Sequence, residues 1–237
     1  MKSLLAIALM AVFIQTPGKV EIKDTLEGKG LVSQPGDILT VDYTGKLVDG
    51  KQFDSSVGKK PFQFIIGAGQ VIKGWEQGML GMKPGGKREL TIPSDLGYGA
   101  NGAGETIPPN SVLKFDVSMI KIDRIKSEIL TKGTGTAVAK GGDSCELHVE
   151  LSDTAGKVLW TTKEGAGQLF PITIGRTGLI KGFTAGVIGM KQGEIRKITV
   201  PGEFGYGPEG RPPTIAPNAT LIFKIEMVKL ASTQEIK

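Results

Sequence analysis

The sequence has few of the residues on which covalent and metal chemistry depend. Of its 237 residues one is cysteine, Cys145, and one is histidine, His148. A single cysteine excludes an intramolecular disulfide, and a single histidine leaves too little for a histidine-rich metal site or a serine–histidine triad. The alternation of residues 145–151 predicts a strand that buries Cys145 as an inert thiol and turns His148 outward into solvent. No cofactor or metal is predicted.

Positive charge is also thinly spread. The net charge of +5 comes from 29 lysines and arginines against 24 acidic residues, and these form no basic stripe with interleaved aromatics. Such a distribution predicts no nucleic-acid partner. With 39% apolar and 22% charged residues, the chain is typical of a globular protein, either one large domain or two small ones.

Long hydrophobic runs are missing except at the amino terminus. The apolar run from Leu4 to Ile14 is shorter than the ~20 residues that a spanning helix needs. Because Lys2 precedes it and polar sequence resumes at Gln15, residues 1–17 are predicted to be a secretory signal peptide, with export of the protein and no stable membrane span after processing. No clean Ala-x-Ala cleavage site precedes Gln15, so an uncleaved N-terminal anchor stays open. The alternative is the first strand or a buried helix of a cytoplasmic protein.

Glycine is abundant, at 35 residues, and it accompanies an internal repeat. Residues 67–85 match residues 175–193 at an offset of 108, whereas Gly50 matches Gly156 at an offset of 106, so the second copy holds two extra residues between Trp160 and Phe170. We therefore predict two homologous modules, residues 18–122 and 123–232, and a tail at 233–237. Residues 123–130, where the modules meet, lack a Gly/Ser/Pro-rich stretch and predict a short connection with limited relative freedom.

Each module is predicted to be α+β, with a curved antiparallel sheet around one short helix. Apolar residues alternate over 39–43 and 113–119, which is typical of strands with one buried face, and Asp49-Gly50 is a hairpin signal. Ile72, Trp75 and Met79 form the apolar stripe of a helix of two or three turns. The sheet can bury its apolar face by wrapping around this helix.

Five sequence blocks of the N-terminal module occur in the order of a known family. They are V-D-Y-T-G-K-L-V-D-G-K-Q-F-D-S-S at 41–56, P-F-Q-F-I-I-G at 61–67, V-I-K-G-W-E-Q-G at 71–78, L-G-Y-G at 96–99 and I-P-P-N-S-V-L-K-F-D-V at 107–117. The module resembles the FKBP-type peptidyl-prolyl cis-trans isomerases, and the blocks cover nearly all of it. The resemblance implies an enzyme that accelerates X-Pro bond rotation in folding proteins.

The resemblance also implies a site. It assigns catalytic roles to Asp54, Tyr43, Tyr98 and Trp75, with Trp75 as the floor of an apolar cavity. The implied substrate-binding residues are Phe53, Phe62, Val71, Ile72, Ile107 and Phe115. The Tyr98 hydroxyl and the Ile72 backbone N–H are expected to donate hydrogen bonds to carbonyls of a proline-containing polypeptide or of a tacrolimus-like macrolide.

Two residues near this site allow a plainer interpretation. Asp54 alone could equally begin the turn at Ser55-Ser56, because aspartate caps turns well; the surrounding motif favours function. Phe64 is interpreted as core behind the pocket.

Two loops depart from the family pattern. Residues 57–60 lack the usual arginine, with Lys59 as the nearest basic residue, and residues 100–106 are Gly-rich and one residue longer. Both are predicted to rim the cavity, where they would alter substrate preference and macrolide affinity.

The second module has lost the polar residues of the implied site. Val149 stands for Tyr43 and Trp160 for Asp54, so we predict little or no isomerase activity there. An alternative function is that of a chaperone or peptide-binding protein whose second module binds clients without catalysis, and a purely structural role is a third. The sequence indicates no oligomeric state.

Overall fold

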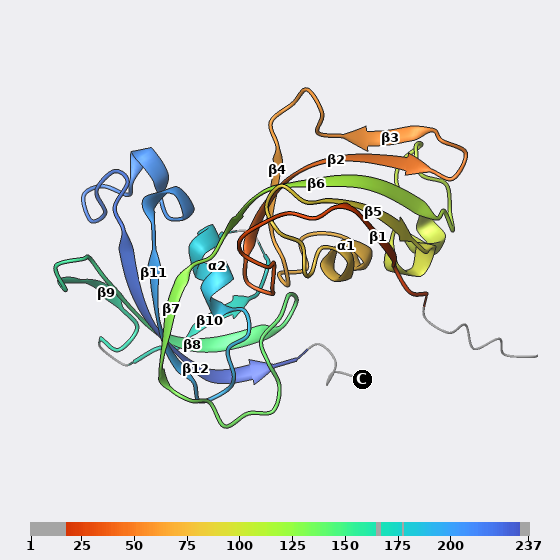
Figure 1. Cartoon of the computed structure of the whole chain (residues 1–237). Helices are drawn as coiled ribbons and strands as arrows, with labels where there is room; N and C mark the ends of the chain where they lie inside the picture. Colours follow the sequence, from red (N-terminus) through yellow and green to blue (C-terminus); the bar gives the residue numbers. More distant parts are fainter. Residues whose placement is uncertain (1–17, 165–166, 177, 233–237) are drawn as a thin grey trace, which may run out of the picture.

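The chain folds into two antiparallel six-stranded sheets, each wrapped around one short helix (Figure 1). The computed structural model describes residues 18–164, 167–176 and 178–232. The predicted signal peptide and the C-terminal tail lie outside these residues. The predicted α+β class with two modules is confirmed. In the described part of the chain, neither helix has the length or the apolar character needed to cross a membrane.

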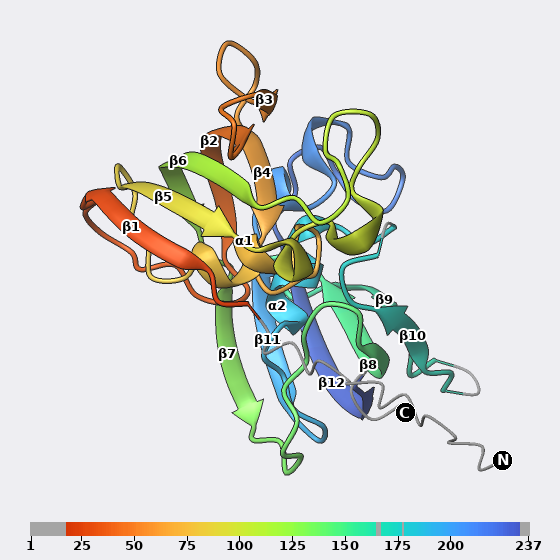
Figure 2. The same ribbon diagram turned by 90° about the vertical axis from the view of Figure 1, so that its right-hand side faces the viewer.

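The N-terminal sheet has the strand order β1-β5-β6-β2-β3, and β4 pairs with β2. Its elements are β1 (Glu21–Leu26), β2 (Ile38–Leu47), β3 (Gln52–Ser55), β4 (Phe62–Ile65), α1 (Lys73–Gly78), β5 (Lys87–Ile92), two 3-10 turns (Ser94–Leu96 and Gly99–Asn101) and β6 (Leu113–Asp123). The strand β1 and the β2–β3 hairpin therefore lie at opposite edges of the sheet (Figure 2).

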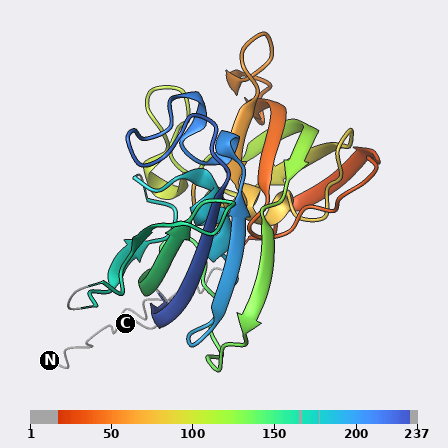
Figure 3. The same cartoon turned by 90° about the vertical axis from the view of Figure 1, so that its left-hand side faces the viewer.

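The C-terminal sheet repeats this arrangement, with the order β10-β8-β12-β11-β7 and β9 paired to β8 (Figure 3). Its elements are β7 (Lys126–Thr131), β8 (Ser144–Ser152), β9 (Val158–Thr161), β10 (Phe170–Thr173), α2 (Lys181–Val187), β11 (Ile195–Val200), two 3-10 turns (Gly202–Phe204 and Gly207–Glu209) and β12 (Leu221–Ala231). The two extra residues fall between β9 and β10, as the change of offset predicts.

Both helices are shorter than predicted. The helix α1 has six residues and α2 has seven, so neither reaches two full turns. The backbone of Ile72 is extended, with ψ 149°, which starts α1 after that residue. A Cβ atom at Gly74 or Gly78 would overlap Ile92 or Leu90 of β5. These glycines let the helix lie close against the sheet, but glycine is a poor helix former and limits the length.

The predicted alternation holds in β6, where Leu113, Phe115 and Val117 are buried. In β2 it holds at Leu39 and Val41, but Ile38, just before the predicted range, is as fully buried as its neighbour Leu39. Ile38 belongs to the hydrophobic cluster of the C-terminal module, whereas Leu39 belongs to that of the N-terminal module. The start of β2 is therefore covered on both faces, one by each module.

The two modules pack against each other through this shared cluster. Ile65, Ala68 and Ile125 join Ile38 in the C-terminal cluster. Two residues separate β6 from β7, so the connection is short, as the sequence predicts. The Gly141 N–H donates to the Gly67 carbonyl at 2.8 Å.

The lone cysteine and histidine have structural surroundings. Cys145 is buried, and burial raises the pKa of its thiol to about 12. His148 lies on the opposite face of β8, as predicted, but it is half-buried, with Nδ1 at 3.2 Å from the Thr162 hydroxyl. The prediction of a fully solvated histidine is therefore wrong, because the segment after β9 covers this part of β8.

Candidate functional site

A cavity of about 650 Å³ opens in the N-terminal module. Its walls come from β2, β3, β4, β6, the start of α1 and the loops around Gln70 and Tyr98. All ten residues that the sequence analysis singled out line it: Tyr43, Phe53, Asp54, Phe62, Val71, Ile72, Trp75, Tyr98, Ile107 and Phe115. Of the four further lining residues, Ala103 and Thr106 belong to the 100–106 segment that was predicted to rim the cavity, whereas Gly69 and Gln70 were not predicted.

Trp75 is the centre of the aromatic wall and is only 4% exposed. The ring centroids of Tyr43 and Phe115 lie 5.1 and 5.3 Å from it, both edge-on. Phe64 lies 5.6 Å away, is buried and does not line the cavity, so its interpretation as core is confirmed. Edge-to-face packing of this kind holds each ring in one orientation. The indole is therefore a rigid apolar surface.

A carboxylate–phenol pair forms one edge of the cavity. The Tyr43 hydroxyl donates to Asp54 Oδ2 at 2.5 Å, and the Ser55 N–H donates to Asp54 Oδ1 at 2.8 Å. Burial raises the pKa of the Tyr43 phenol above its usual range, and its hydrogen bond to Asp54 raises the pKa further. Tyr43 is therefore neutral, and its proton is directed to Asp54. Asp54 belongs to β3 itself, beside the turn that it was alternatively expected to begin.

Two hydrogen-bond donors at the cavity are uncommitted. Within the residues that the structure describes, the Tyr98 hydroxyl has no hydrogen-bond partner, and its side chain is 40% exposed. The Ile72 carbonyl accepts from Trp75 and Glu76, but in the same described part its own N–H has no acceptor. Uncommitted donors beside an apolar wall are suited to bind carbonyl oxygens of a ligand.

The loop that leads into Ile72 is braced from α1. Glu76 accepts from the Gly67 N–H at 2.5 Å and the Gly69 N–H at 2.8 Å. Burial raises the pKa of the Glu76 carboxyl, and the two N–H donors lower it. Glu76 was not predicted as a site residue, and the second module has Thr184 at the matching position. Its spacing from the glycines does not by itself reveal the brace.

The two loops that depart from the family pattern differ in their position relative to the cavity. Ala103 and Thr106 of the 100–106 segment line the cavity, as predicted. Lys59 and Lys60 do not; they line an adjoining groove instead. Residues 57–60 therefore do not line the cavity itself, and their two lysines lie beside it in a groove that shares Tyr43, Asp54 and Phe62 with the cavity.

A second, smaller cavity of about 460 Å³ occupies the same place in the C-terminal module. It is lined by the counterparts of the ten residues: Val149, Leu159, Trp160, Phe170, Leu179, Ile180, Phe183, Tyr206, Ile215 and Phe223. The carboxylate is gone, and Arg211 enters, with its guanidinium 5.9 Å from the Tyr206 ring centre. The second cavity keeps the apolar walls of the first, but its edge lacks the carboxylate–phenol pair and contains Arg211.

A sheet wrapped around a helix, with an aromatic cavity between them, defines a module that binds apolar groups by shape. Family comparison makes this specific: the model of the FKBP-type peptidyl-prolyl cis-trans isomerases matches residues 30–120 and again residues 135–228. The chain belongs to this family. The resemblance stated from the motifs and the predicted enzyme class, a peptidyl-prolyl cis-trans isomerase, are confirmed.

Similar proteins match either about half of the chain, which is the length of one module, or most of it. The chain is 51% identical over 106 residues to an FK506-binding protein of Neisseria meningitidis serogroup C, covering 44% of this chain and 97% of that protein. It is 47% identical to human peptidyl-prolyl cis-trans isomerase FKBP2, over 52% of this chain and 91% of FKBP2. Human FKBP9 matches 90% of this chain at 33% identity, over 38% of FKBP9.

Proposed function

We propose that the N-terminal module rotates X-Pro bonds of folding polypeptides within the Trp75 cavity. Uncatalysed rotation takes tens to hundreds of seconds, because amide resonance must be broken. The twisted amide has less charge separation than the planar amide, so a water-poor apolar cavity favours it relative to water. Tighter binding of the twisted form lowers the barrier without a nucleophile or a metal.

In this proposal the groups around the cavity have separate roles. The prolyl ring packs on Trp75, and the Tyr98 hydroxyl and Ile72 N–H donate to carbonyls of the bound polypeptide. The Asp54 charge, held by Tyr43 and Ser55, lies at the cavity edge, where it disfavours the negative carbonyl oxygen of the planar amide. That penalty falls as the amide twists, so the carboxylate contributes to differential binding.

The observation that carries the proposal is the convergence of these groups around one cavity. It predicts that Asp54→Ala lowers kcat/KM for an X-Pro peptide about tenfold, which corresponds to roughly 1.4 kcal/mol of lost transition-state stabilisation. Exchange NMR or a protease-coupled assay on the full chain measures it.

Asp49→Ala is the matched control, because Asp49 is an exposed carboxylate in the same hairpin that binds only its own turn, at the Lys51 N–H. Equal rates for both variants would remove Asp54 from the mechanism. No turnover by the parent protein would remove the proposed activity altogether.

Two further points belong to this proposal. A tacrolimus-like macrolide is expected to bind in the same cavity and to inhibit turnover, as the name FK506-binding protein of the neisserial relative suggests for that protein. The apolar run from Leu4 to Ile14 supports export as the place of action.

A second candidate function concerns the C-terminal module, which we propose binds unfolded clients without catalysis. Its support is the second cavity, where Trp160 is 45% exposed and its ring lies 5.7 Å from that of Phe170. An exposed tryptophan at the mouth of an apolar cavity is the kind of residue that dominates binding energy.

This candidate predicts that Trp160→Ala weakens binding of a permanently unfolded client by about five- to thirtyfold, which corresponds to about 1–2 kcal/mol. Fluorescence anisotropy with a labelled client measures the dissociation constant. Val158→Ala, an exposed apolar residue of the same strand outside the cavity, serves as control. Equal affinities for both variants would contradict client binding at this cavity.

A further inference from the structure

A groove of about 550 Å³ adjoins the N-terminal cavity and is lined from both modules. It shares Tyr43, Asp54 and Phe62 with the cavity. Lys59 and Lys60 line it from the loop after β3, and Lys181, the first residue of α2, reaches it from the C-terminal module. The groove is thus a continuation of the cavity that the first module does not build alone.

The groove is strongly basic. Lys59 Nζ donates to the Ser55 carbonyl at 2.9 Å and Lys181 Nζ to Gln63 Oε1 at 2.6 Å, both neutral acceptors. Across the described ranges, none of the three lysines forms an ion pair. Three ammonium groups therefore meet a single lining carboxylate, Asp54.

That carboxylate offsets only one of the three positive charges. Its two oxygens accept hydrogen bonds from the Tyr43 hydroxyl and the Ser55 N–H rather than from a lysine. The next nearby carboxylate, Asp42, does not line the groove, and its Oδ1 accepts from the Ser56 hydroxyl at 2.9 Å. The groove keeps a net positive potential beside an apolar cavity, which attracts anionic groups.

An extended polypeptide advances about 3.3–3.6 Å per residue. A chain whose prolyl ring lies against Trp75 can therefore reach the adjoining groove, across the shared wall of Tyr43 and Phe62, within a few residues. Its side chains there come within reach of the lysines.

We propose that this groove is a subsite for the carboxylate side chains of the prolyl polypeptide, so that the enzyme prefers X-Pro bonds flanked by Asp or Glu. The inference rests on the proposed function for the placement of the polypeptide. Lys181 gives the C-terminal module a direct part in substrate choice, although that module lacks the polar edge of the active cavity. Exposed charge pairs are individually weak and are screened by salt. The preference is therefore several-fold and is largest at low ionic strength.

The test uses the full chain and X-Pro peptides that carry Glu, Gln or Lys two residues before or two residues after the proline. One of the two peptide positions is expected to reach the groove. For that position the kcat/KM of the parent protein at low salt is expected to be about three- to tenfold higher for the Glu peptide than for the Lys peptide. Lys181→Glu is expected to reduce this ratio at least threefold. Anisotropy with labelled peptides measures the same preference in binding, independently of catalysis.

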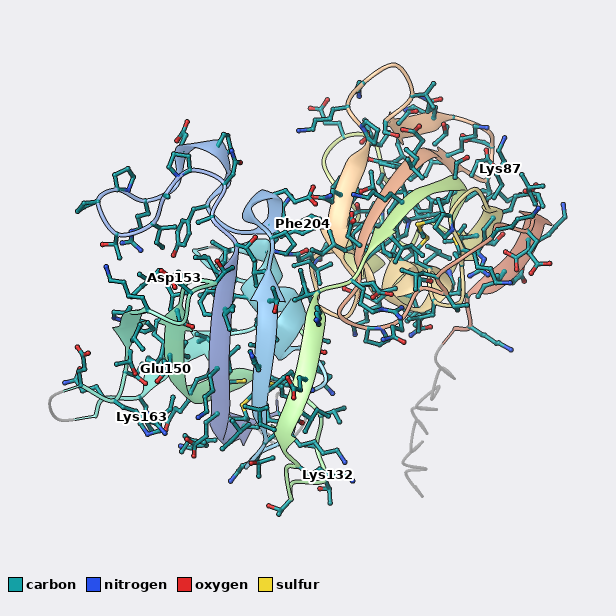
Figure 4. All side chains as sticks on the ribbon, turned by 60° about the vertical axis from the view of Figure 1, so that its left-hand side comes forward. Lys87, Lys132, Glu150, Asp153, Lys163 and Phe204 are labelled. Carbon is teal, nitrogen blue, oxygen red and sulfur yellow. The ribbon has the colours of Figure 1, made fainter. Side chains whose placement is uncertain are left out.

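Lys132→Glu is the matched control for charge. Lys132 is exposed and lies at the end of the C-terminal module remote from the N-terminal module (Figure 4). A ratio that changes equally in both variants reports net charge alone and overturns the subsite. Equal turnover and equal affinity of Glu and Lys peptides also overturn it, while leaving the isomerase intact. Peptides bound with a charge preference but not turned over would support the subsite and overturn the proposed activity.

Discussion

Replacement of Trp75 by alanine is expected to lower kcat/KM for X-Pro peptides about 30- to 100-fold and the free energy of unfolding by about 3–5 kcal/mol. The loss of turnover follows because the indole is the floor of the cavity, so its truncation removes the surface on which the prolyl ring packs and admits water. A 30- to 100-fold loss corresponds to about 2–2.7 kcal/mol of transition-state stabilisation. The loss of stability follows from the void left among Tyr43, Phe64 and Phe115, whose rings surround the buried indole.

Met119→Ala separates the two effects. Met119 is buried in the core of the same module and does not line the cavity. Its truncation is expected to lower stability by about 2–5 kcal/mol but to leave turnover within about threefold, when measured where the variant is folded. Urea unfolding and exchange NMR give both values. Equal losses of turnover in the two variants would show that Trp75 acts through stability alone.

Trp75→Phe refines the assignment of the cavity floor. Phe183 stands in the same position of the C-terminal module, so phenylalanine fits this fold. The indole Nε1 is buried and has no hydrogen-bond partner within the described residues. Its removal therefore leaves no polar group unsatisfied. Trp75→Phe is expected to keep most of the turnover that Trp75→Ala loses, because an aromatic floor remains.

The cavity was predictable because its residues lie in short motifs that the chain repeats. Asp54 and Trp75 fall inside blocks that span nearly the whole N-terminal module, and the offset then locates Trp160 and Phe183 in the second copy. Such information needs no knowledge of side-chain geometry. The groove with Lys181 was not predictable in the same way, since it joins residues far apart in the sequence and in different modules.

Burial at the module interface was hidden for a related reason. An alternating pattern indicates that one face of a strand is covered, but it cannot reveal what lies against the other face. Ile38 and Leu39 are adjacent in sequence and both buried, each in the cluster of a different module. The sequence pattern of β2 is the same with or without a partner module, so the interface could be found only in the structure.

Buried charged residues were missed as well, because arginine and glutamate in a strand or helix are ordinarily interpreted as surface. Arg88 and its counterpart Arg196 are both largely buried and both bind carbonyls at the end of the module's helix. The repeat contains this pair, but only the structure shows that each side chain reaches a carbonyl of the helix ten residues earlier in the chain.

Arg88→Met is expected to lower the free energy of unfolding by about 2–4 kcal/mol. The guanidinium donates to the carbonyls of Gly78 and Leu80 at 2.7 and 2.8 Å and to Asp24 through two hydrogen bonds. Methionine fills a similar volume but leaves the end of α1 without these donors. Asp24 is more than half exposed and can be hydrated, so most of the loss comes from the carbonyls. Urea unfolding of the full chain measures it.

The pH dependence of stability tests the contact between Arg88 and Asp24 through the titration of the Asp24 carboxyl. The hydrogen bond from Arg88 lowers the pKa of the Asp24 carboxyl below its ordinary value. A lowered pKa in the folded state stabilises the protein above about pH 4, and that stabilisation is lost as the pH falls through the lowered pKa. In Arg88→Met this contribution is absent, so stability should fall less steeply between about pH 4 and pH 2. Equally steep curves would contradict the pairing.

Arg88→Lys distinguishes charge from geometry at this position. Lysine keeps the positive charge but cannot bind two carbonyls and a carboxylate in the planar fork of arginine. It is therefore expected to recover the acid dependence due to Asp24 but only part of the lost stability. Because α1 begins directly after Ile72 and contains Trp75, loosening its far end should also lower kcat/KM. A lysine variant with full turnover would confine the arginine to stability, whereas reduced turnover in a folded variant would show that the clamp positions the cavity floor.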